Sequence, residues 1–328
     1  MEQNFVKFFS GKRCLVTGGT GLIGREVVER LLNYDAIVTS ISMDALEIDS
    51  RAEYKRGDLT DFNFCVDQMQ NIDFVFHLAG VKGSVDVTLS QPASFFVPLL
   101  MMNTNVLEAA RLNSIKRLVY TSSIGAYEPS EIFVEKAAVE TGAPMDSFPG
   151  WAKRMAELQI DAYKRQYGIT NYSAVRPCNV YGPGDNFDPQ NAMVIPSLMA
   201  RVASGENPLK VWGDGEAIRD FAYSGDVAQG ILQTIYHGGP GHYLNLGSGV
   251  GTTIRQLVEV MSNIIGFDYE FDLSKSSGFS KRVMDISLAR KFVDYRPSTS
   301  LEMGIQKTWE WFQLNFSEHK KKHNYFRE

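Results

Sequence analysis

The sequence predicts an α/β fold: a doubly wound parallel sheet with a smaller, interwoven lobe toward the C-terminus. Three observations lead to this fold class. Short apolar runs alternate with helical patterns through the first half of the chain, as in successive βαβ units. A glycine-rich stretch, VTGGTGLIG, joins the first run to the first helical pattern. After residue 176 the alternation gives way to loops rich in glycine and proline, such as NVYGPGDNFDPQ.

The strands and helices of the main sheet can be assigned from these patterns. Five runs are rich in apolar and β-branched residues, as expected for strands that helices cover on both faces. They are residues 13–17, 36–41, 73–78, 117–121 and 172–176. The helical patterns are residues 24–33, 92–112 and 151–167. This order predicts parallel strands joined by crossover helices.

The composition argues against several functional classes. Hydrophobic residues make up 44% of the chain, and 33 Lys and Arg against 38 Asp and Glu give a formal net charge of -5. This mild acidity argues against a nucleic-acid partner, which would favour a basic surface. No apolar run reaches membrane-spanning length, and no signal-peptide pattern opens the chain. Cys14, Cys65 and Cys178 lie too far apart to indicate a disulfide framework or a zinc site. We therefore expect a cytoplasmic protein without a metal or membrane partner.

The glycine-rich stretch has the spacing of a dinucleotide-binding turn. Gly18, Gly21 and Gly24 follow the first strand and lie where a helix begins. Glycines let the backbone turn tightly and approach a pyrophosphate, and the helix N-terminus offers it unpaired N–H groups and a partial positive charge. A tight turn without a ligand is the alternative. Spacing, position and the βαβ series together favour a Rossmann-type domain that binds NAD or NADP.

The end of the second strand bears on the choice between these cofactors. An acidic residue there binds the adenosine ribose of NAD, whereas an arginine accommodates the phosphate of NADP. The stretch TSISMD places Ser42 at this position and Asp44 two residues later, with no arginine. A solvated loop residue explains Asp44 equally well. The choice stays open, with a lean toward NAD because no basic residue is present.

The same patterns predict the domain organisation. The 328 residues suffice for one large or two modest domains. We predict a dinucleotide-binding Rossmann domain over residues 1–176, to which some later segments return. An interwoven substrate-binding lobe follows over 177–316, and its last strong helical pattern is 301–316. Residues 317–328, with three consecutive lysines, are predicted to be a solvated tail.

Motifs along the chain resemble those of the extended short-chain dehydrogenase/reductases, the NAD-dependent nucleotide-sugar epimerase/dehydratase family. They are TGGTGLIG, GDLTD, FVFHLAG, VYTSS, RPCNVYGPGD and RDFAYSGDVA. Within the family, GPGDNFDPQNAMVIPSLM, KVWGDG and SSGFSKR look most like the GDP-fucose synthase branch, and this resemblance covers nearly the whole chain. It implies an enzyme whose substrate is a nucleotide-diphosphate sugar, in this branch a GDP-linked one.

The resemblance also implies which residues surround the two ligands. For the cofactor these are Gly18, Gly21, Leu22, Ile23, Gly24, Ser42, Asp58, Leu59, Leu78 and Lys153. For the substrate they are Ser123, Asn179, Arg201, Arg219 and Arg282. Arginine suits phosphates because its planar fork donates two parallel hydrogen bonds. A surface ion pair explains Arg201 and Arg282 equally well, whereas Arg219 lies in the family-like motif RDFAY. We expect His77, in FHLAG, to be structural.

The chemistry of the family uses a Ser or Thr, a Tyr and a Lys around a sugar hydroxyl and the nicotinamide. Ser123 and Lys153 match the serine and the lysine. Four residues before Lys153, where the family has its tyrosine, this chain has Pro149. A proline suits the first turn of a helix, but it has no side-chain proton to give. The phenol that would exchange the hydroxyl proton, with its pKa lowered by the lysine, is therefore missing.

Further substitutions disfavour two related reactions. The dehydratase branch carries Asp and Glu just after its Ser or Thr, and these positions hold Ile124 and Gly125 here. The GDP-fucose synthase branch uses a Cys and a His for its 3,5-epimerisation, and the matching positions hold Gly125 and Met193. None of these side chains can move a proton. We therefore expect neither dehydration nor 3,5-epimerisation.

Hydride transfer at a sugar carbon remains, and we expect C4. The predicted activity is that of a dehydrogenase, reductase or 4-epimerase on a GDP-linked hexose or heptose. Losing positioned acid–base catalysis costs roughly 10²–10⁴-fold in rate and leaves positioning intact. The groups that could carry the proton instead are Tyr127, Tyr181, Tyr223, Asp146, Lys153 itself or a water held by Ser123.

A different class of function is a catalytically silent member of the family. Such a protein would bind cofactor or nucleotide sugar as a sensor or a partner subunit. The missing tyrosine favours it. Because Ser123, Lys153 and the glycine turn are all retained, the enzyme is favoured over it. We also predict a homodimer through helices 92–112 and 151–167, because the second has two apolar faces and the sheet can cover one.

Overall fold

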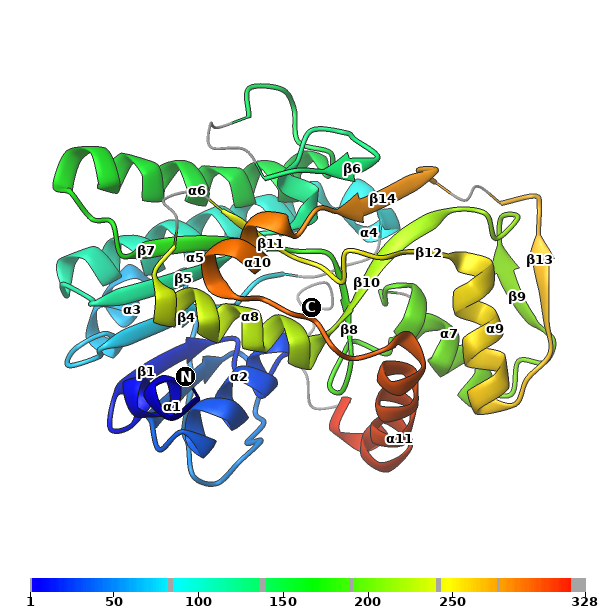
Figure 1. The fold of residues 1–328 in the computed structure, drawn as a ribbon, viewed down its shortest axis with the longest axis horizontal. Coiled ribbons are helices and arrows are strands. Elements are labelled where there is room, and N and C mark those ends of the chain that lie inside the picture. Colours follow the sequence, from blue (N-terminus) through cyan, green and yellow to red (C-terminus); the bar gives the residue numbers. More distant parts are fainter. Residues whose placement is uncertain are drawn as a thin grey trace.

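The structure is a computed structural model and describes residues 2–81, 85–135, 140–188, 191–239, 243–275 and 278–319. A seven-stranded parallel sheet with helices on both faces forms one side, and a smaller lobe forms the other (Figure 1). The strand order is β11-β7-β5-β4-β1-β2-β3. The predicted fold class, a Rossmann-type doubly wound sheet, is confirmed.

The order of the strands reverses next to β1. The seven strands are β1 (Arg13–Thr17), β2 (Ile37–Ser42), β3 (Glu53–Arg56), β4 (Phe74–His77), β5 (Arg117–Thr121), β7 (Tyr172–Pro177) and β11 (Leu244–Leu246). The chain lays β2 and β3 on one side of β1 and then β4, β5, β7 and β11 on the other. Loops after β1 and β4 therefore leave in opposite directions. Ligands of such sheets bind at this reversal, outside the carboxyl ends of the strands.

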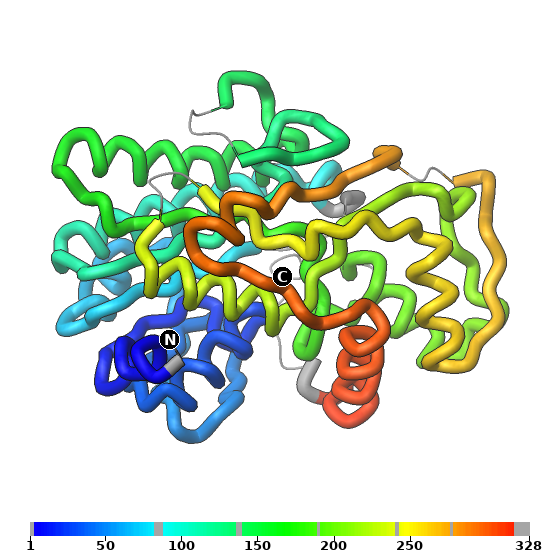
Figure 2. The backbone as a smooth tube through the Cα atoms, in the orientation of Figure 1, coloured from blue at the N-terminus to red at the C-terminus, as the bar shows by residue number. Residues whose placement is uncertain are grey.

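Two groups of helices cover the sheet. The helices of this part are α1 (Glu2–Phe9), α2 (Leu22–Asn33), α3 (Phe62–Gln68), α4 (Val85–Ser90), α5 (Pro92–Leu112), α6 (Ser147–Tyr167), α8 (Ser224–His237) and α10 (Ser287–Val293). α5 packs against α3 and α6 on one face, and α8 packs against α2 and α10 on the other (Figure 2). Central residues such as Val75 and Val119 are fully buried between the two groups.

The smaller lobe has its own core. Its strands are β6 (Ile132–Phe133), β8 (Asn179–Tyr181), β9 (Leu209–Trp212), β10 (Ile218–Tyr223), β12 (Gly251–Thr253), β13 (Tyr269–Asp272) and β14 (Lys281–Met284), and its helices are α7 (Val194–Ala203), α9 (Ile254–Ile265) and α11 (Leu301–His319). Met199, Leu257 and Ile305 are buried at the centre of this second hydrophobic cluster.

Segments cross between the two parts in both directions. β11, late in the chain, pairs with β7 at the edge of the main sheet, and β6, from the first half, pairs with β14 in the smaller lobe. This arrangement is the interwoven one that the sequence predicts, although the boundaries at residues 176 and 316 stay predictions. α11 runs on to His319, past the predicted end at 316, and the rest of the predicted tail, 320–328, lies outside the described residues.

The predicted elements agree with the observed ones except at their ends. β1, β5 and α5 have the predicted bounds. The predicted start of α6 at residue 151 is wrong, because the helix begins at Ser147 and takes Pro149 and Gly150 into its first turn. Pro149 is tolerated there because the first N–H groups of a helix have no partner within it, and Gly150 donates its N–H to the carbonyl oxygen of Asp146 at 3.0 Å.

Candidate active site

The glycine turn after β1 needs glycine at two positions for the fold itself. Gly18 has a φ of 70°, and a Cβ there would lie 2.9 Å from the Cα of Ala79 in the loop after β4. A Cβ at Gly24 would overlap the carbonyl oxygen of Gly18 and lie 2.7 Å from the Cα of Gly19. The turn is thus closed against two neighbouring backbone segments, and only glycine fits at either position.

Gly21 lies in a more open environment than these two residues. It is the N-cap of α2, and among the described residues a Cβ there would meet only the oxygen of Gly18, at 3.2 Å. Leu22 and Ile23 form the first turn of α2, whose N–H groups have no partner within the helix. Open space beside a helix N-terminus fits the pyrophosphate of NAD, so the residues present suit that cofactor.

The end of β2 is tied to this turn. Thr20 donates a hydrogen bond from Oγ1 to Oδ2 of Asp44 at 2.6 Å, and the N–H of Asp44 donates to Oγ of Ser42 at 3.1 Å. Asp44 is therefore fixed against the glycine turn, and the solvated-loop alternative is disfavoured. No sequence pattern indicated the contact with Thr20.

The other residues implied for the cofactor lie in the loops after β3 and β4. Asp58 is exposed and accepts a hydrogen bond from the N–H of Thr60 at 2.8 Å, while Leu59 is buried. Leu78 is half-buried, and its N–H donates to Oγ1 of Thr17 at 3.2 Å. Leu78 therefore borders the glycine turn, whereas Asp58 shapes its own loop. Their contacts with the cofactor stay predictions.

Ser123 and Lys153 converge on the end of β5. Ser123 caps the short 3₁₀ helix η1 (Ile124–Ala126), and its Oγ accepts a hydrogen bond from the N–H of Gly125 at 3.0 Å. Lys153, on α6, donates from Nζ to the carbonyl oxygen of Thr121 at 2.8 Å. Its Nζ also lies 3.6 Å from the place of a Cβ on Gly80, in the loop after β4. The two side chains therefore approach the carboxyl ends of β4 and β5.

The environment of Lys153 lowers the pKa of its ammonium group. Burial lowers the pKa of Lys153 to about 8, and the carboxylate of Glu157, one turn later on α6, partly opposes this effect. Nζ lies 5.3 Å from the ring centroid of Tyr120, a distance at which the ring attracts a cation. Lys153 is a cation at neutral pH that can titrate just above it.

A buried chain of polar groups links the ends of β1 and β4, through α5, to β5. Thr17 Oγ1 lies 2.8 Å from Nδ1 of His77, whose Nε2 lies 3.0 Å from Oδ1 of Asn103, and Nδ2 of Asn103 donates to Oη of Tyr120 at 3.1 Å. Burial lowers the pKa of His77 to about 3, with a further contribution from Lys153, so the ring is neutral. This geometry favours the predicted structural role of His77. The participation of Asn103 was not foreseen from the sequence.

The environments of the three candidate tyrosines do not favour any of them as the proton carrier that the resemblance to the family leads one to expect at position 149. Tyr127 is buried and its Oη donates to Oδ1 of Asn245 at 2.8 Å, and burial raises its pKa. Burial also raises the pKa of Tyr181, and it raises that of Tyr223 to about 12. Each phenol therefore holds its proton more firmly than a tyrosine in water. A packed aromatic residue, rather than a proton carrier, is favoured at all three positions.

The predicted substrate residues fall into two groups. Arg219 on β10 and Arg282 on β14 are register partners in neighbouring strands, and burial lowers the pKa of both. Arg282 additionally lowers the pKa of Arg219, because the two positive charges repel each other. Asn179, on β8, donates to the carbonyl oxygen of Asp220 at 3.0 Å. Arg201 instead pairs with Glu206 through two nitrogens, which favours the ion-pair alternative for that residue.

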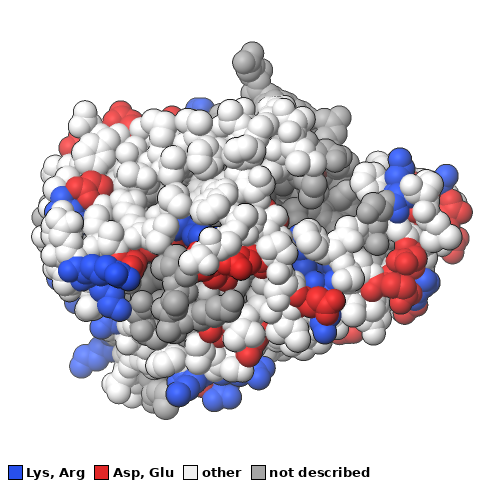
Figure 3. Space-filling model, turned by 90° about the horizontal axis from the view of Figure 1, so that it is seen from above, with Lys and Arg blue, Asp and Glu red and all other residues white. Residues whose placement is uncertain are grey.

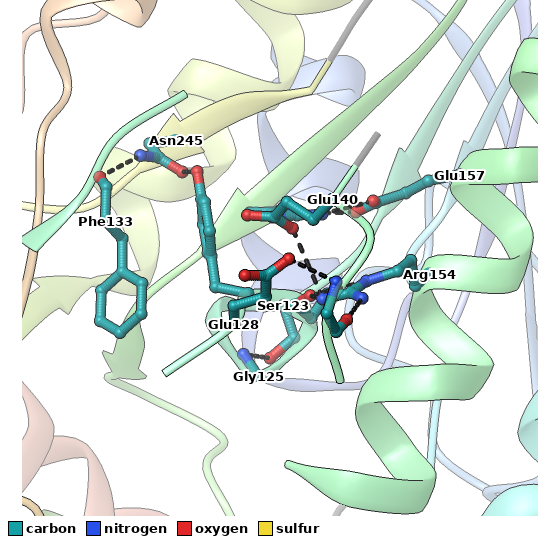
Figure 4. Close-up of polar contacts among 12 residues, drawn as sticks. Ser123, Gly125, Glu128, Phe133, Glu140, Arg154, Glu157 and Asn245 are labelled. Atoms are coloured by element: carbon teal, nitrogen blue, oxygen red, sulfur yellow. Dashed lines mark hydrogen bonds and ion pairs between the residues drawn. The ribbon is translucent and has the colours of Figure 1, made fainter. Parts of the chain in front are cut away.

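A buried cluster of charges fixes α6 beside the site (Figure 4). Arg176, at the end of β7, donates to both carboxylate oxygens of Glu157 at 2.8 and 2.6 Å and to Oε2 of Glu140 at 2.9 Å. Arg154 donates from Nε to the carbonyl oxygen of Ala126, in η1, at 3.0 Å. These four side chains are almost fully buried. The cluster therefore holds α6 against both β7 and the turn that carries Ser123.

The part of the chain that the structure describes can also be compared with the requirements of nucleic-acid, metal and membrane sites. On the face seen in Figure 3, acidic and basic side chains are interspersed and no basic patch gathers. Within the described ranges there is no group of three or more His, Cys, Asp or Glu that could hold a metal ion. Among the helices of those ranges, none has the length and apolar character needed to cross a membrane.

A parallel sheet with a glycine turn at its reversal, joined to a serine and a lysine near the end of β5, is the arrangement of a dinucleotide-binding α/β protein. Comparison with protein families agrees: residues 14–247 match the NAD dependent epimerase/dehydratase family. The chain belongs to that family, and NAD is accordingly its cofactor. The family resemblance and the lean toward NAD are thereby confirmed.

Individual relatives cover nearly the whole chain. It is 27% identical to a GDP-L-fucose synthase of Sinorhizobium fredii, over 94% of this chain and 98% of the relative. It is also 27% identical to a GDP-L-colitose synthase of Yersinia pseudotuberculosis, over 92% and 97% of the two chains. Among solved structures, a UDP-glucose 4-epimerase of Thermotoga maritima with UDP-glucose has a TM-score of 0.81 at 28% identity and covers 93% of this chain and 99% of its own.

Substitutions at two glycines test the proposed cofactor turn. Gly24→Ala is expected to lower the free energy of unfolding without cofactor, because its methyl group would overlap the backbone of Gly18. Gly21→Ala should leave that stability nearly unchanged and weaken NAD binding by roughly tenfold, about 1.4 kcal/mol, because its methyl group would occupy the open side. Thermal unfolding and calorimetric titration with NAD measure the two effects. Wild-type affinity in Gly21→Ala would show that NAD binds elsewhere.

Proposed function

We propose that this chain moves hydride at C4 of a GDP-linked hexose or heptose, as a dehydrogenase, reductase or 4-epimerase. The observation that carries the proposal is the approach of Ser123 and Lys153 to the carboxyl ends of β4 and β5, next to the glycine turn. A protein that only bound NAD could use Lys153 for the nicotinamide ribose, but the retention of Ser123 at the end of the same strand, β5, together with Lys153 favours an enzyme. The missing tyrosine then marks altered chemistry rather than an absent reaction.

The residues present divide the work of such a reaction. NAD, when bound, supplies the acceptor or donor of hydride. Ser123 accepts a hydrogen bond from Gly125, which leaves its own hydroxyl hydrogen available to a sugar oxygen. Lys153 provides a positive charge for the nicotinamide ribose and for negative charge that develops on the sugar oxygen. Neither role requires a group at position 149.

The nucleotide would bind toward the smaller lobe. Arg219 and Arg282 provide two adjacent guanidinium groups on β10 and β14, which suits a diphosphate. Asn179 lies on β8, the other neighbour of β10. Relatives named for GDP-linked sugars support guanine as the base, while the relative solved with UDP-glucose makes a UDP-sugar the comparison to test.

Transfer of isotope tests this function directly. Purified protein with NAD is supplied with GDP-hexoses and GDP-heptoses that carry deuterium at C4, and with UDP-glucose as the comparison. We expect deuterium to appear in the cofactor for at least one GDP-sugar. If both ligands bind by calorimetry and no deuterium moves with any sugar, the chain is the catalytically silent binder instead.

Removal of the lysine tests the site. Lys153→Ala is expected to lower turnover by at least roughly 10²-fold and to weaken NAD binding, because the charge beside Ser123 and the ribose is lost. Lys164→Ala, an exposed position on the same helix, is the matched control and should change neither. Steady-state kinetics and NAD titration measure both effects. Wild-type turnover in Lys153→Ala would remove Lys153 from the proposed site.

The exposed side of α5 supports the proposed homodimer. Val97 and Met101 lie one turn apart and are 49% and 44% exposed, and Leu112 is 51% exposed at the end of the helix. Met101→Glu is therefore expected to yield a monomer in sedimentation at micromolar concentration, because it would place a charge in the interface. Leu314→Glu, on α11, is the control and should leave the dimer intact. A monomeric wild-type protein would contradict the proposal.

A further inference from the structure

An acidic side chain reaches the Ser123 turn from the start of α6. Asp146 immediately precedes α6, and its N–H donates to the carbonyl oxygen of Gly125 at 3.1 Å. A Cβ on Gly125 would lie 2.7 Å from Cγ of Asp146 and closer still to its Oδ2. The carboxylate of Asp146 therefore occupies the space that any side chain at position 125 would fill.

This position connects Asp146 to the proposed chemistry. Gly125 is the residue whose N–H binds Oγ of Ser123, so the carboxylate of Asp146 and the serine hydroxyl both contact the same residue. The side chain of Asp146 is 43% exposed, so a bound ligand can reach it. Within the described ranges neither carboxylate oxygen accepts a hydrogen bond at the start of α6, and Oδ1 forms only a long ion pair with Nη1 of Arg282 at 3.7 Å, so the carboxylate retains capacity to accept a hydrogen bond from a ligand.

We propose that Asp146 is the catalytic group that exchanges the proton of the reacting sugar hydroxyl. The inference rests on the proposed function. In the oxidation direction, the O–H bond of the sugar breaks and its proton forms a new O–H bond with the Asp146 carboxylate. The C–H bond at the same carbon breaks, its hydride leaves to NAD, and a carbonyl forms from the electron pair left on oxygen. Reduction reverses each of these steps.

The charge environment of Asp146 suits such a group. Burial raises the pKa of Asp146 above its usual range, and Arg282 on β14, with Nη1 at 3.7 Å from Oδ1, partly offsets this effect. Arg282 is the charged group that faces the carboxylate from a neighbouring element. The η1 turn that packs on it, Ile124–Ala126, has no charged side chain. The carboxyl of Asp146 therefore keeps its proton to a higher pH than an ordinary aspartate does.

Asp146→Asn tests the inference, with Asp161→Asn on the same helix as the matched control. We expect kcat to fall roughly 10²–10⁴-fold with little change in KM, while Asp161→Asn behaves as the wild type. The acid limb of the pH profile of kcat/KM, where activity rises with pH as Asp146 ionises, should vanish. Asp146→Asn should fold at least as stably as the wild type at neutral pH, because a raised pKa means that folding disfavours the ionised carboxylate.

Two further measurements keep the inference independent of turnover. The carboxyl carbon of Asp146, followed by NMR in protein labelled at aspartate, should titrate above the ordinary range and shift when GDP-mannose is added with NAD. Pro149→Tyr in the Asp146→Asn background should restore part of kcat by returning a phenol beside Lys153. If the wild type moves no hydride, the proposed function fails, and the ligand-dependent shift alone decides whether Asp146 faces the sugar. An unchanged kcat and pH profile in Asp146→Asn, or an Asp146 signal indifferent to both ligands, would overturn the inference.

Discussion

The buried ion cluster around Arg176 determines where the active-site helix lies. The Cζ atom of Arg176 lies 4.1 Å from the ring centroid of Tyr127 and 3.5 Å from that of Tyr243. The guanidinium group also pairs with the carboxylates of Glu157 and Glu140. Breaking a buried pair of this kind leaves an uncompensated charge in the interior and costs about 3–5 kcal/mol. Glu157 lies one turn after Lys153 on α6. The ion pair between Arg176 and Glu157 therefore fixes the helix and, with it, how far Lys153 extends toward the end of β5. The position of Lys153 beside β5 therefore depends on the buried charges of Arg176, Glu157 and Glu140.

The cluster also acts on the electrostatics of the site. Burial lowers the pKa of Lys153, the carboxylate of Glu157 raises it by a smaller amount, and the balance leaves it at about 8. Glu157 is shared with Arg176, so its charge is only partly available to the lysine. On the other side, the neutral ring of His77 adds no positive charge to the site. The carboxylate of Glu157 thus stabilises the protonated form of Lys153, and burial is the main effect that destabilises it.

Local patterns were sufficient for five strands of the seven-stranded sheet and for placing the residues carried by motifs, whereas β3 and β11 were not predicted and the roles of those residues stay predictions. β1 and β5 are short apolar runs with clear ends, and the glycine turn, Ser123 and Lys153 lie at fixed offsets from such strands. Contacts between distant loops carry no such pattern. The hydrogen bond from Thr20 to Asp44 and the fit of Asp146 against Gly125 depend on how a loop returns to the sheet. The sequence placed the start of α6 at residue 151 rather than at Ser147 for a related reason. Proline and glycine usually disfavour a helix, and whether a first turn tolerates them depends on the residues before it.

In the proposed site, Pro149 and Gly125 belong to one arrangement around Asp146. A glycine at 125 provides the space that the carboxylate of Asp146 fills, and the carbonyl oxygen of Asp146 accepts a hydrogen bond from Gly150 as α6 begins. A proline at 149 suits that early start and removes the phenol. In the proposed reaction, this exchange replaces a phenol by a carboxyl as the group that holds the proton. An unperturbed phenol titrates near ~10 and a carboxyl near ~3.9, so a carboxylate is already ionised at neutral pH without help from a cation. Burial raises the pKa of Asp146, which makes the protonated form needed for the reverse step more accessible. The exchange therefore changes which protonation state is at hand, while the equilibrium between the sugar alcohol and its keto form stays the same, because a catalyst speeds both directions alike.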